Sequence, residues 1–161
     1  MKTNKMKKVL IAMDYDPTAQ KVAEMGFLLA KTMGAEVVLL HIIADATYYS
    51  ALEYSQISGF SGYMDMGQVQ LDSLDGLKNA SLHFLEKIKH HLGDKTIQTL
   101  VKEGDFAESI LESAKKLHVD LIVMGTHSRR WLDNIIMGSV TEKVLHHTTI
   151  PLFIIPTKKH S

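Results

Sequence analysis

Apolar residues gather in five short runs along this sequence, and longer stretches with helical spacing separate most of them. The runs cover residues 8–14, 35–43, 96–101, 121–124 and 150–156. Most are continuously apolar, which is typical of parallel strands that are buried on both faces of a sheet. The partly alternating run 96–101 and the run 150–156, which contains a proline near each end, are expected at the edges. The pattern therefore predicts five strands with the other runs in the interior.

The stretches between the runs carry the apolar stripes and the end signals of α-helices. This alternation of strand and helix favours parallel pairing through right-handed crossovers. The helix signals are Asp16 before Pro17, Gly34, the stripe from 70 to 92 that stops at Gly93, Asp105 with Glu108, and Ser139 with Glu142. We therefore predict a single α/β domain over residues 1–161, with a doubly wound five-stranded parallel sheet and helices on both faces.

Residues 44–68 interrupt this alternation. They hold several aromatic residues among serine and glycine, namely Tyr48, Tyr49, Tyr54, Phe60 and Tyr63. A loop of this length inside a compact domain is usually either functional or disordered. The sequence leaves open whether it is a mobile lid, a surface for a partner, or a plain insertion.

Composition narrows the classes of function. Lysine plus arginine and aspartate plus glutamate both number 18, so the formal net charge is zero and no general attraction to nucleic acid or to a membrane surface is expected. Cysteine is absent, which excludes thiolate metal sites and a cysteine nucleophile and fits a reducing compartment. The apolar run 9–13 is too short for a signal peptide, and no run approaches the ~18 residues of a membrane span. We expect a soluble cytoplasmic protein without nucleic-acid or membrane partners.

The segment 120–142 carries the candidate binding chemistry. It reads as a buried strand that ends at Gly125, then a loop, then a helix that begins at a capping box of Ser139 and Glu142. The backbone N–H groups at such a helix start, with the positive end of the helix dipole, make an anion site, to which Ser139 and Thr141 add hydroxyl donors. Phosphate is the expected anion. The alternative is that the glycines only turn the chain.

A second candidate group lies at the end of another strand. Asp14 is the last residue of the first run. Ligands of open α/β sheets lie at the carboxyl ends of the strands, where the strand order reverses. We expect the strands of Asp14 and Gly125 to be neighbours at this reversal, so that one cleft holds Asp14, Ile42 or Ile43, the loop 125–138 and Ser139.

The segments MGTHSRR at 124–130 and MGSVTEKV at 137–144 resemble the universal stress protein family, whose nucleotide-binding members carry G-x2-G-x9-G-[ST]. Further blocks at 11–14, 38–43, 103–108 and 150–155 also fall where the family has them, so the resemblance covers almost the whole chain. It implies an adenine nucleotide alpha hydrolase-like fold with strand order 3-2-1-4-5. It also implies homodimers paired through the last strand, 150–156, and bound ATP in one branch of the family.

The resemblance also implies a set of ligand contacts. Ala12, Met13 and Asp14 would line the adenine and ribose end, and Ile42 would contact adenine through its backbone. The ribose and phosphates would be wrapped by Met124, Gly125, Ser128, Gly138, Ser139, Val140 and Thr141. Ser128 departs from the motif, which has a second glycine there, and it adds a side chain where phosphate approaches and where positive φ is costly. Its hydroxyl is an alternative phosphate donor, and Arg129 and Arg130 are candidates for charge-assisted bonds.

Other chemistry finds little support in the sequence. The Walker motif G-x-x-x-x-G-K-[ST] does not occur, and the adjacent histidines at 90–91 and 146–147 point about 100° apart on a helix and cannot chelate together. His127 lies in the binding loop without a visible base–nucleophile pair. We expect a non-enzymatic protein that binds ATP or AMP and uses occupancy of the nucleotide site as a stress-linked signal. Whether Mg²⁺ binds together with the nucleotide is left open. The alternatives are a nucleotide-free dimer that acts through protein contacts, and a slow metal-dependent phosphohydrolase that uses His127 or Asp14.

Overall fold

The computed structural model describes residues 5–14, 18–43, 74–126 and 138–157. Its strands are β1 (Lys8–Met13), β2 (Glu36–Ile43), β3 (Gln98–Glu103), β4 (Leu121–Gly125) and β5 (Leu152–Ile155). Its helices are α1 (Ala19–Met33), α4 (Leu74–Leu92), α5 (Phe106–Lys116) and α6 (Ser139–His147). The predicted loop 44–68 lies outside the described residues.

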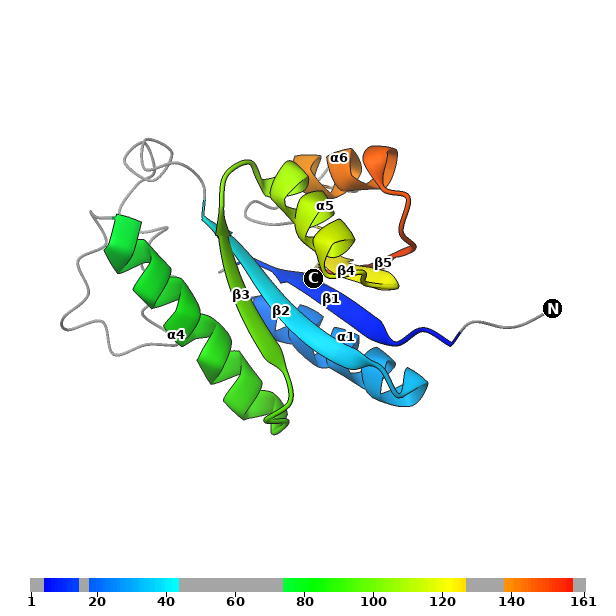
Figure 1. Ribbon diagram of the computed structural model, residues 1–161, viewed down its shortest axis with the longest axis horizontal. Helices are drawn as coiled ribbons and strands as arrows, with labels where there is room; N and C mark the ends of the chain where they lie inside the picture. Colours follow the sequence, from blue (N-terminus) through cyan, green and yellow to red (C-terminus); the bar gives the residue numbers. More distant parts are fainter. Residues whose placement is uncertain (1–4, 15–17, 44–73, 127–137, 158–161) are drawn as a thin grey trace, which may run out of the picture.

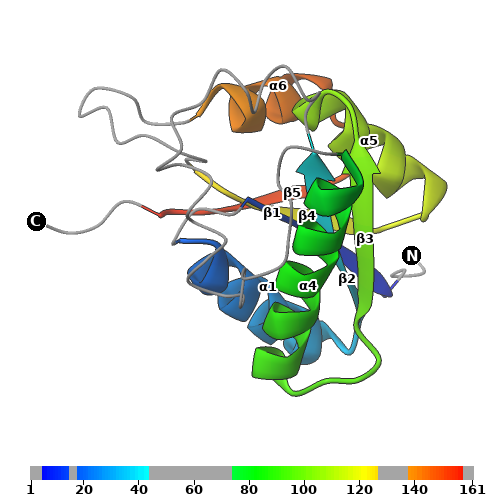
Figure 2. The same cartoon turned by 90° about the vertical axis from the view of Figure 1, so that its left-hand side faces the viewer.

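All five strands belong to one parallel sheet in the order β3-β2-β1-β4-β5. Figures 1 and 2 show α5 and α6 on one face of this sheet and α1 and α4 on the other. The predicted fold class and the predicted strand order 3-2-1-4-5 are therefore confirmed. The order reverses at β1, whose neighbours β2 and β4 lie far apart in the sequence.

The sheet separates two halves of the apolar core. One half lies under α1 and α4 and includes the fully buried Phe84, and the other lies under α5 and α6 around Ile122. Most side chains of β1, β2 and β4 are buried, whereas those of β3 are only partly so. In β5, Phe153 is 40% exposed. The predicted edge positions of 96–101 and 150–156 are thus confirmed, because fewer neighbours cover these strands.

Several element ends follow the predicted signals, and others shift. Gly34 and Gly93, with φ of 64° and 73°, follow α1 and α4 in the left-handed conformation that glycine adopts easily. The first helix begins at Ala19 with Thr18 at its N-cap, while Asp16 and Pro17 lie outside the described residues. The third strand begins at Gln98, two residues after the predicted start. These shifts are of the size at which helix and strand ends normally vary.

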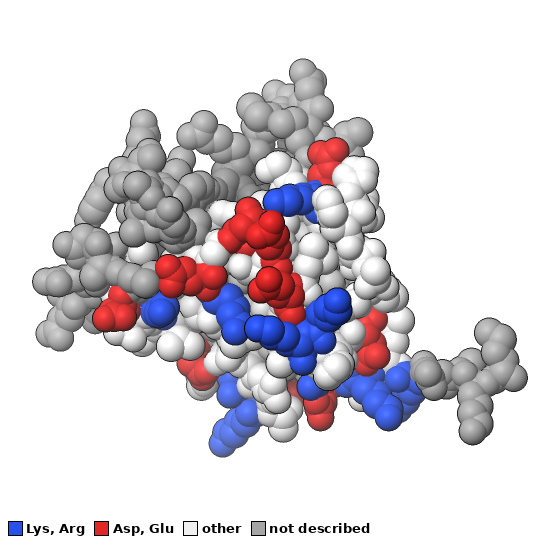
Figure 3. All heavy atoms as spheres, turned by 45° about the horizontal axis from the view of Figure 1, so that its top comes forward, with Lys and Arg blue, Asp and Glu red and all other residues white. Residues whose placement is uncertain are grey.

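The surface over α5 and α6 carries charges of both signs. In Figure 3, acidic side chains gather near the middle of this face and basic side chains border them. This mixture agrees with the formal net charge of zero. Within the described ranges, no helix combines the length and the apolar character that crossing a bilayer requires.

Candidate functional site

A cavity of about 260 Å³ opens at the carboxyl ends of β1, β2 and β4. This is the point of the sheet where the strand order reverses, which is where open α/β sheets bind their ligands. The volume is close to that of the smallest small-molecule sites, roughly 300 Å³. The cleft predicted from the sequence therefore exists at the expected place.

Most of the residues predicted for the site line this cavity. They are Ala12, Met13, Asp14, Ile42, Met124, Gly125, Ser139, Val140 and Thr141. Gly138 is the N-cap residue of α6, next to Ser139. Ser128, Arg129 and Arg130 lie outside the described residues, as does His127.

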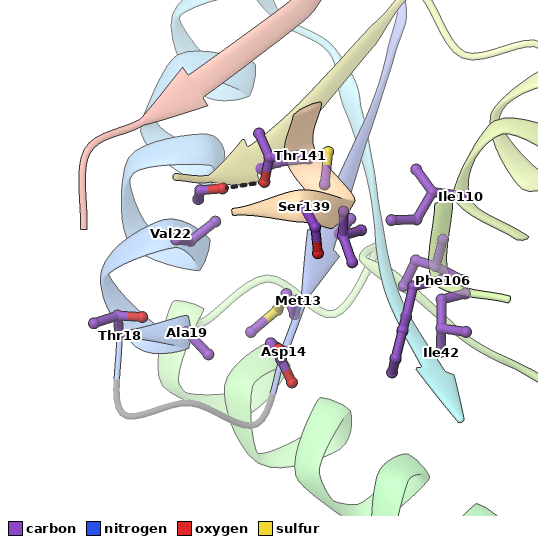
Figure 4. Close-up of a pocket in the computed structure, with 15 residues that line it drawn as sticks. Met13, Asp14, Thr18, Ala19, Val22, Ile42, Phe106, Ile110, Ser139 and Thr141 are labelled. Atoms are coloured by element: carbon purple, nitrogen blue, oxygen red, sulfur yellow. Dashed lines mark hydrogen bonds between the residues drawn. The ribbon is translucent and has the colours of Figure 1, made fainter. Parts of the chain in front are cut away.

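Residues at the starts of α1 and α5, which were not predicted from the sequence as site residues, complete the walls. They are Thr18, Ala19, Val22, Phe106 and Ile110, together with Leu40 of β2. Figure 4 shows Phe106, Ile110 and Ile42 together on one side and Thr18, Ala19 and Val22 on the other. Their positions in the sequence could have indicated these residues. They lie at the start of a helix that follows a strand, and such a start lies at the carboxyl edge of the sheet.

Hydrogen bonds tie the two residues that flank 127–137 to each other and to the sheet. The N–H of Gly138 donates to the carbonyl of Thr126 at 2.6 Å. The N–H of Thr126 donates in turn to the carbonyl of Ile155, at 3.0 Å, and its hydroxyl lies 3.1 Å from that of Thr157. The start of α6 is therefore held at a fixed place beside β4 and β5.

The start of α6 differs from the predicted capping box. Gly138 is the N-cap residue, with φ of −68° and ψ of 156°, and no side chain among the described residues caps the helix. The first residue of the helix is Ser139, so its hydroxyl is not in the N-cap position and the prediction that it caps the helix is wrong. The first i→i−4 bond runs from the N–H of Glu142 to the carbonyl of Gly138. The N–H groups of residues 139–141 therefore have no partner within the helix.

Thr141 fixes the helix rather than offering its hydroxyl to a ligand. It is 4% exposed, and its Oγ1 donates to the carbonyl of Gly125 at 2.9 Å (Figure 4). A hydroxyl has a single proton, so this bond uses the donor that was predicted to bind phosphate. Ser139 is exposed at the first position of α6, so its hydroxyl stays a candidate donor to a ligand.

The cavity combines three chemical environments. Its two side walls are mainly apolar, the end of β1 contributes the carboxylate of Asp14, and the start of α6 contributes amides and a positive dipole end. Among the described lining residues, Asp14 alone is charged. Within the described part of the chain, no group of three or more histidine, aspartate or glutamate side chains is placed to hold a metal. The arrangement suits a flat, partly apolar molecule that bears hydroxyl groups and an anionic end.

The profile of the universal stress protein family matches residues 5–156. This chain belongs to the universal stress protein family. It is 31% identical over 159 residues to universal stress protein MJ0531 from Methanocaldococcus jannaschii, in an alignment that covers 97% of this chain and 85% of that protein. The resemblance found in the sequence is thereby confirmed.

Solved structures share the fold of this universal stress protein. The structure of MJ0577 from Methanocaldococcus jannaschii superposes with a TM-score of 0.73 at 25% identity, covering 98% of this chain and 100% of that chain. A universal stress protein in complex with cAMP gives a TM-score of 0.63 at 14% identity, covering 96% of this chain and 100% of that chain. At 14% identity the second similarity concerns the fold alone.

Proposed function

We propose that this universal stress protein binds an adenine nucleotide, ATP or AMP, in the cavity at the carboxyl edge of the sheet. The observation that carries the proposal is the juxtaposition of apolar walls, the Asp14 carboxylate and the start of α6, whose N-cap residue Gly138 has no side chain, around one cavity. A universal stress protein of the same fold was solved in complex with cAMP, which supports an adenine nucleotide as the ligand class.

The chemistry of the walls suggests how the nucleotide lies. The purine fits between the apolar walls near Ile42, because a base has two apolar faces. The ribose hydroxyls donate hydrogen bonds to the carboxylate of Asp14. The phosphate lies at residues 138–140, where the amides and the dipole of α6 attract an anion. In this arrangement Mg²⁺ enters with the phosphates of ATP, which supply its oxygen ligands.

We further propose that occupancy, rather than catalysis, is the output. The ligand end of α6 adjoins the bond between Gly138 and Thr126, the two residues that flank 127–137. For occupancy to act as a signal, a phosphate at this junction has to bind one arrangement of residues 126–138 more tightly than another, which is the requirement for a ligand-driven shift. The setting is the cytoplasm, whose reducing character fits a chain without cysteine.

Two measurements on purified protein test the proposal. The protein is denatured and the supernatant is chromatographed for ATP, ADP and AMP, and in parallel both ATP and AMP are titrated calorimetrically with and without Mg²⁺. We expect an adenine nucleotide in the supernatant, or binding of ATP or AMP in the titration. The absence of both copurified nucleotide and titratable binding contradicts the proposal.

Timed ATP turnover that is equal in the wild type and in His127→Ala excludes a phosphohydrolase that depends on His127.

Replacing Asp14 separates the ribose contact from the fold. We expect Asp14→Ala to bind AMP about 10–100-fold more weakly, because a hydrogen bond to a charged group contributes roughly 1.5–3 kcal/mol. Glu36→Ala is the matched control, since Glu36 is exposed at the amino end of β2, away from the cavity. Equal affinity of both variants would remove Asp14 from the site.

A dimer that acts through protein contacts is the second candidate function. The strand β5 lies at the edge of the sheet, and Phe153 in β5 and Leu145 in α6 are 40% and 46% exposed. An apolar edge strand favours pairing with another chain, and we propose a second copy joined through 150–156. Sedimentation of Phe153→Glu should then report a monomer where the wild type is a dimer. The control is Leu82→Glu on α4, where an equally exposed residue, at 42%, should leave the dimer intact.

A further inference from the structure

A buried histidine lies within the apolar strand β2. His41 is 1% exposed, and its neighbours Leu40 and Ile42 are buried as well. Burying an imidazole among apolar groups is costly unless its polar atoms are hydrogen-bonded. Packing alone would be served by leucine, which fits β2 without this cost. The histidine therefore calls for a polar role.

The ring of His41 is bonded to the end of the neighbouring strand. Its Nδ1 lies 2.9 Å from the main-chain oxygen of Met13. Because a carbonyl oxygen only accepts, Nδ1 carries the proton and donates it. The ring is itself oriented by Phe84 of α4, with centroids 5.9 Å apart and an interplanar angle of 65°. A fixed ring thus holds one particular carbonyl.

That carbonyl belongs to the last paired residue of β1. The register between β1 and β2 ends with Met13 opposite His41, and the next residue, Asp14, has left the strand. The bond therefore holds the peptide between Met13 and Asp14, and both of these residues line the cavity. The orientation of this peptide sets the direction in which the Asp14 side chain leaves the backbone.

We infer that His41 is a positioning residue for the nucleotide site: its Nδ1–H fixes the Met13–Asp14 peptide so that the Asp14 carboxylate meets the ribose hydroxyls. The inference rests on the proposed function and assigns His41 no contact with the ligand. Its effect on binding passes through Asp14, and this makes it distinguishable from a residue that only stabilises the core.

The experiment measures AMP affinity in three variants of His41. Asparagine carries an amide N–H close to the place of Nδ1, glutamine carries it further out, and leucine carries none. We expect His41→Leu and His41→Gln to bind AMP about tenfold more weakly, as for the loss of a typical positioning contact. His41→Asn should recover affinity to within about threefold of the wild type. Equal losses in all three variants, or in none, overturn the inference.

A double-mutant cycle separates positioning from stability. In the Asp14→Ala background, His41→Leu should cause no further loss of AMP affinity, because the group that it orients is gone. Ile88→Val is the control for stability, since this fully buried α4 residue lies in the same half of the core. It should lower the melting temperature and leave AMP affinity unchanged. Additive losses for His41→Leu and Asp14→Ala overturn the inference.

If the His41 variants do not fold, a measurement that leaves His41 in place tests the inference. The imidazole Nδ1–H of His41 should be visible by nitrogen-15 NMR as a slowly exchanging proton. Its resonance should shift when AMP saturates the wild type and stay in place when AMP saturates Asp14→Ala; no shift in the wild type overturns the inference. If wild-type protein binds neither AMP nor ATP, the proposed function fails and the inference fails with it. Wild-type binding that His41→Leu retains in full overturns the inference alone.

Discussion

The helices α5 and α6 begin side by side at the same edge of the sheet with nearly the same backbone but different N-cap residues. Asp105 has φ of −65° and ψ of 136°, and Gly138 has φ of −68° and ψ of 156°. The carboxylate of Asp105 accepts the N–H of Glu108 at 3.0 Å and lies 3.4 Å from Nζ of Lys143. Gly138 has no side chain, so α6 receives no such cap.

The difference teaches what a helix start offers to an anion. At α5, the N–H of Glu108 holds the pKa of the Asp105 carboxyl below its usual range, and Lys143 adds to this effect. The amides at a helix start in this protein thus stabilise a negatively charged oxygen. At α6 the N-cap residue, Gly138, has no side chain and so supplies no capping carboxylate, and the helix start borders the cavity. In the proposed function, a ligand phosphate takes the role at α6 that Asp105 takes at α5.

Giving α6 the cap of α5 should produce the largest effect. We expect Gly138→Asp to weaken AMP binding by at least about 100-fold, because the new carboxylate occupies the amides and repels phosphate. Stability should stay equal or rise by a few tenths of a kcal/mol, since aspartate is a better N-cap than glycine and any residue adopts this backbone. Calorimetry and thermal denaturation measure the two quantities. The control Gly138→Ala adds a side chain without charge and should lose much less affinity; retained AMP binding in Gly138→Asp would contradict the placement of the phosphate.

Removing the hydrogen bond from Thr141 to the carbonyl of Gly125 should have the next largest effect. This change should lower the stability of the fold. Thr141→Val keeps the shape of the side chain but leaves the partly buried carbonyl of Gly125 without its hydroxyl donor. We expect a loss of about 1–2 kcal/mol in the free energy of unfolding, measured with urea. An unchanged free energy of unfolding would show that the bond between Thr141 and Gly125 does not hold α6.

Removing the cap of α5 should have the smallest effect. Asp105→Ala should cost about 1 kcal/mol at neutral pH and leave AMP affinity nearly unchanged, because Asp105 does not line the cavity. The exposed position of Asp105 favours the lower end of the measured range for caps.

The cost of Asp105→Ala should also depend on pH in a defined direction. The folded-state pKa of Asp105 lies below its value in the unfolded chain, which is about 3.9. Its contribution is therefore complete above that value and is lost as the pH falls through the folded-state pKa. Urea denaturation of both proteins at pH 7 and at pH 2.5 should show the stability gap shrinking. A gap that stays constant would mean that the carboxylate is not what caps α5.

The sequence predicts the strands of this fold well because their signal is local. A buried parallel strand must be apolar on both faces, so β1, β2 and β4 stand out as runs, and the end of the run before Asp14 also marks the end of a strand. The edges are equally visible: β5 is bracketed by prolines, which cannot pair inside a sheet, and β3 alternates in part between apolar and polar residues. The site at the strand ends follows from the order of the strands.

The missed features depend on choices that a pattern does not record. Gly138 and Ser139 are both acceptable N-caps, and the chain settles the choice through the bond between Gly138 and Thr126. Val22 and Ile110 carry the same apolar stripe whether they face the core or the cavity. Likewise, His41 in an apolar run gives no sign that it reaches across to Met13.

A comparison of AMP with adenosine on the wild-type protein tests the central claim most directly. Both ligands share the base and the ribose, and they differ only in the group that we place at the start of α6. Calorimetric titration of both ligands at low ionic strength should give an affinity for AMP that is at least about tenfold higher, as expected for charge-assisted bonds to helix amides. Equal affinities, or no binding of either ligand, would contradict the account.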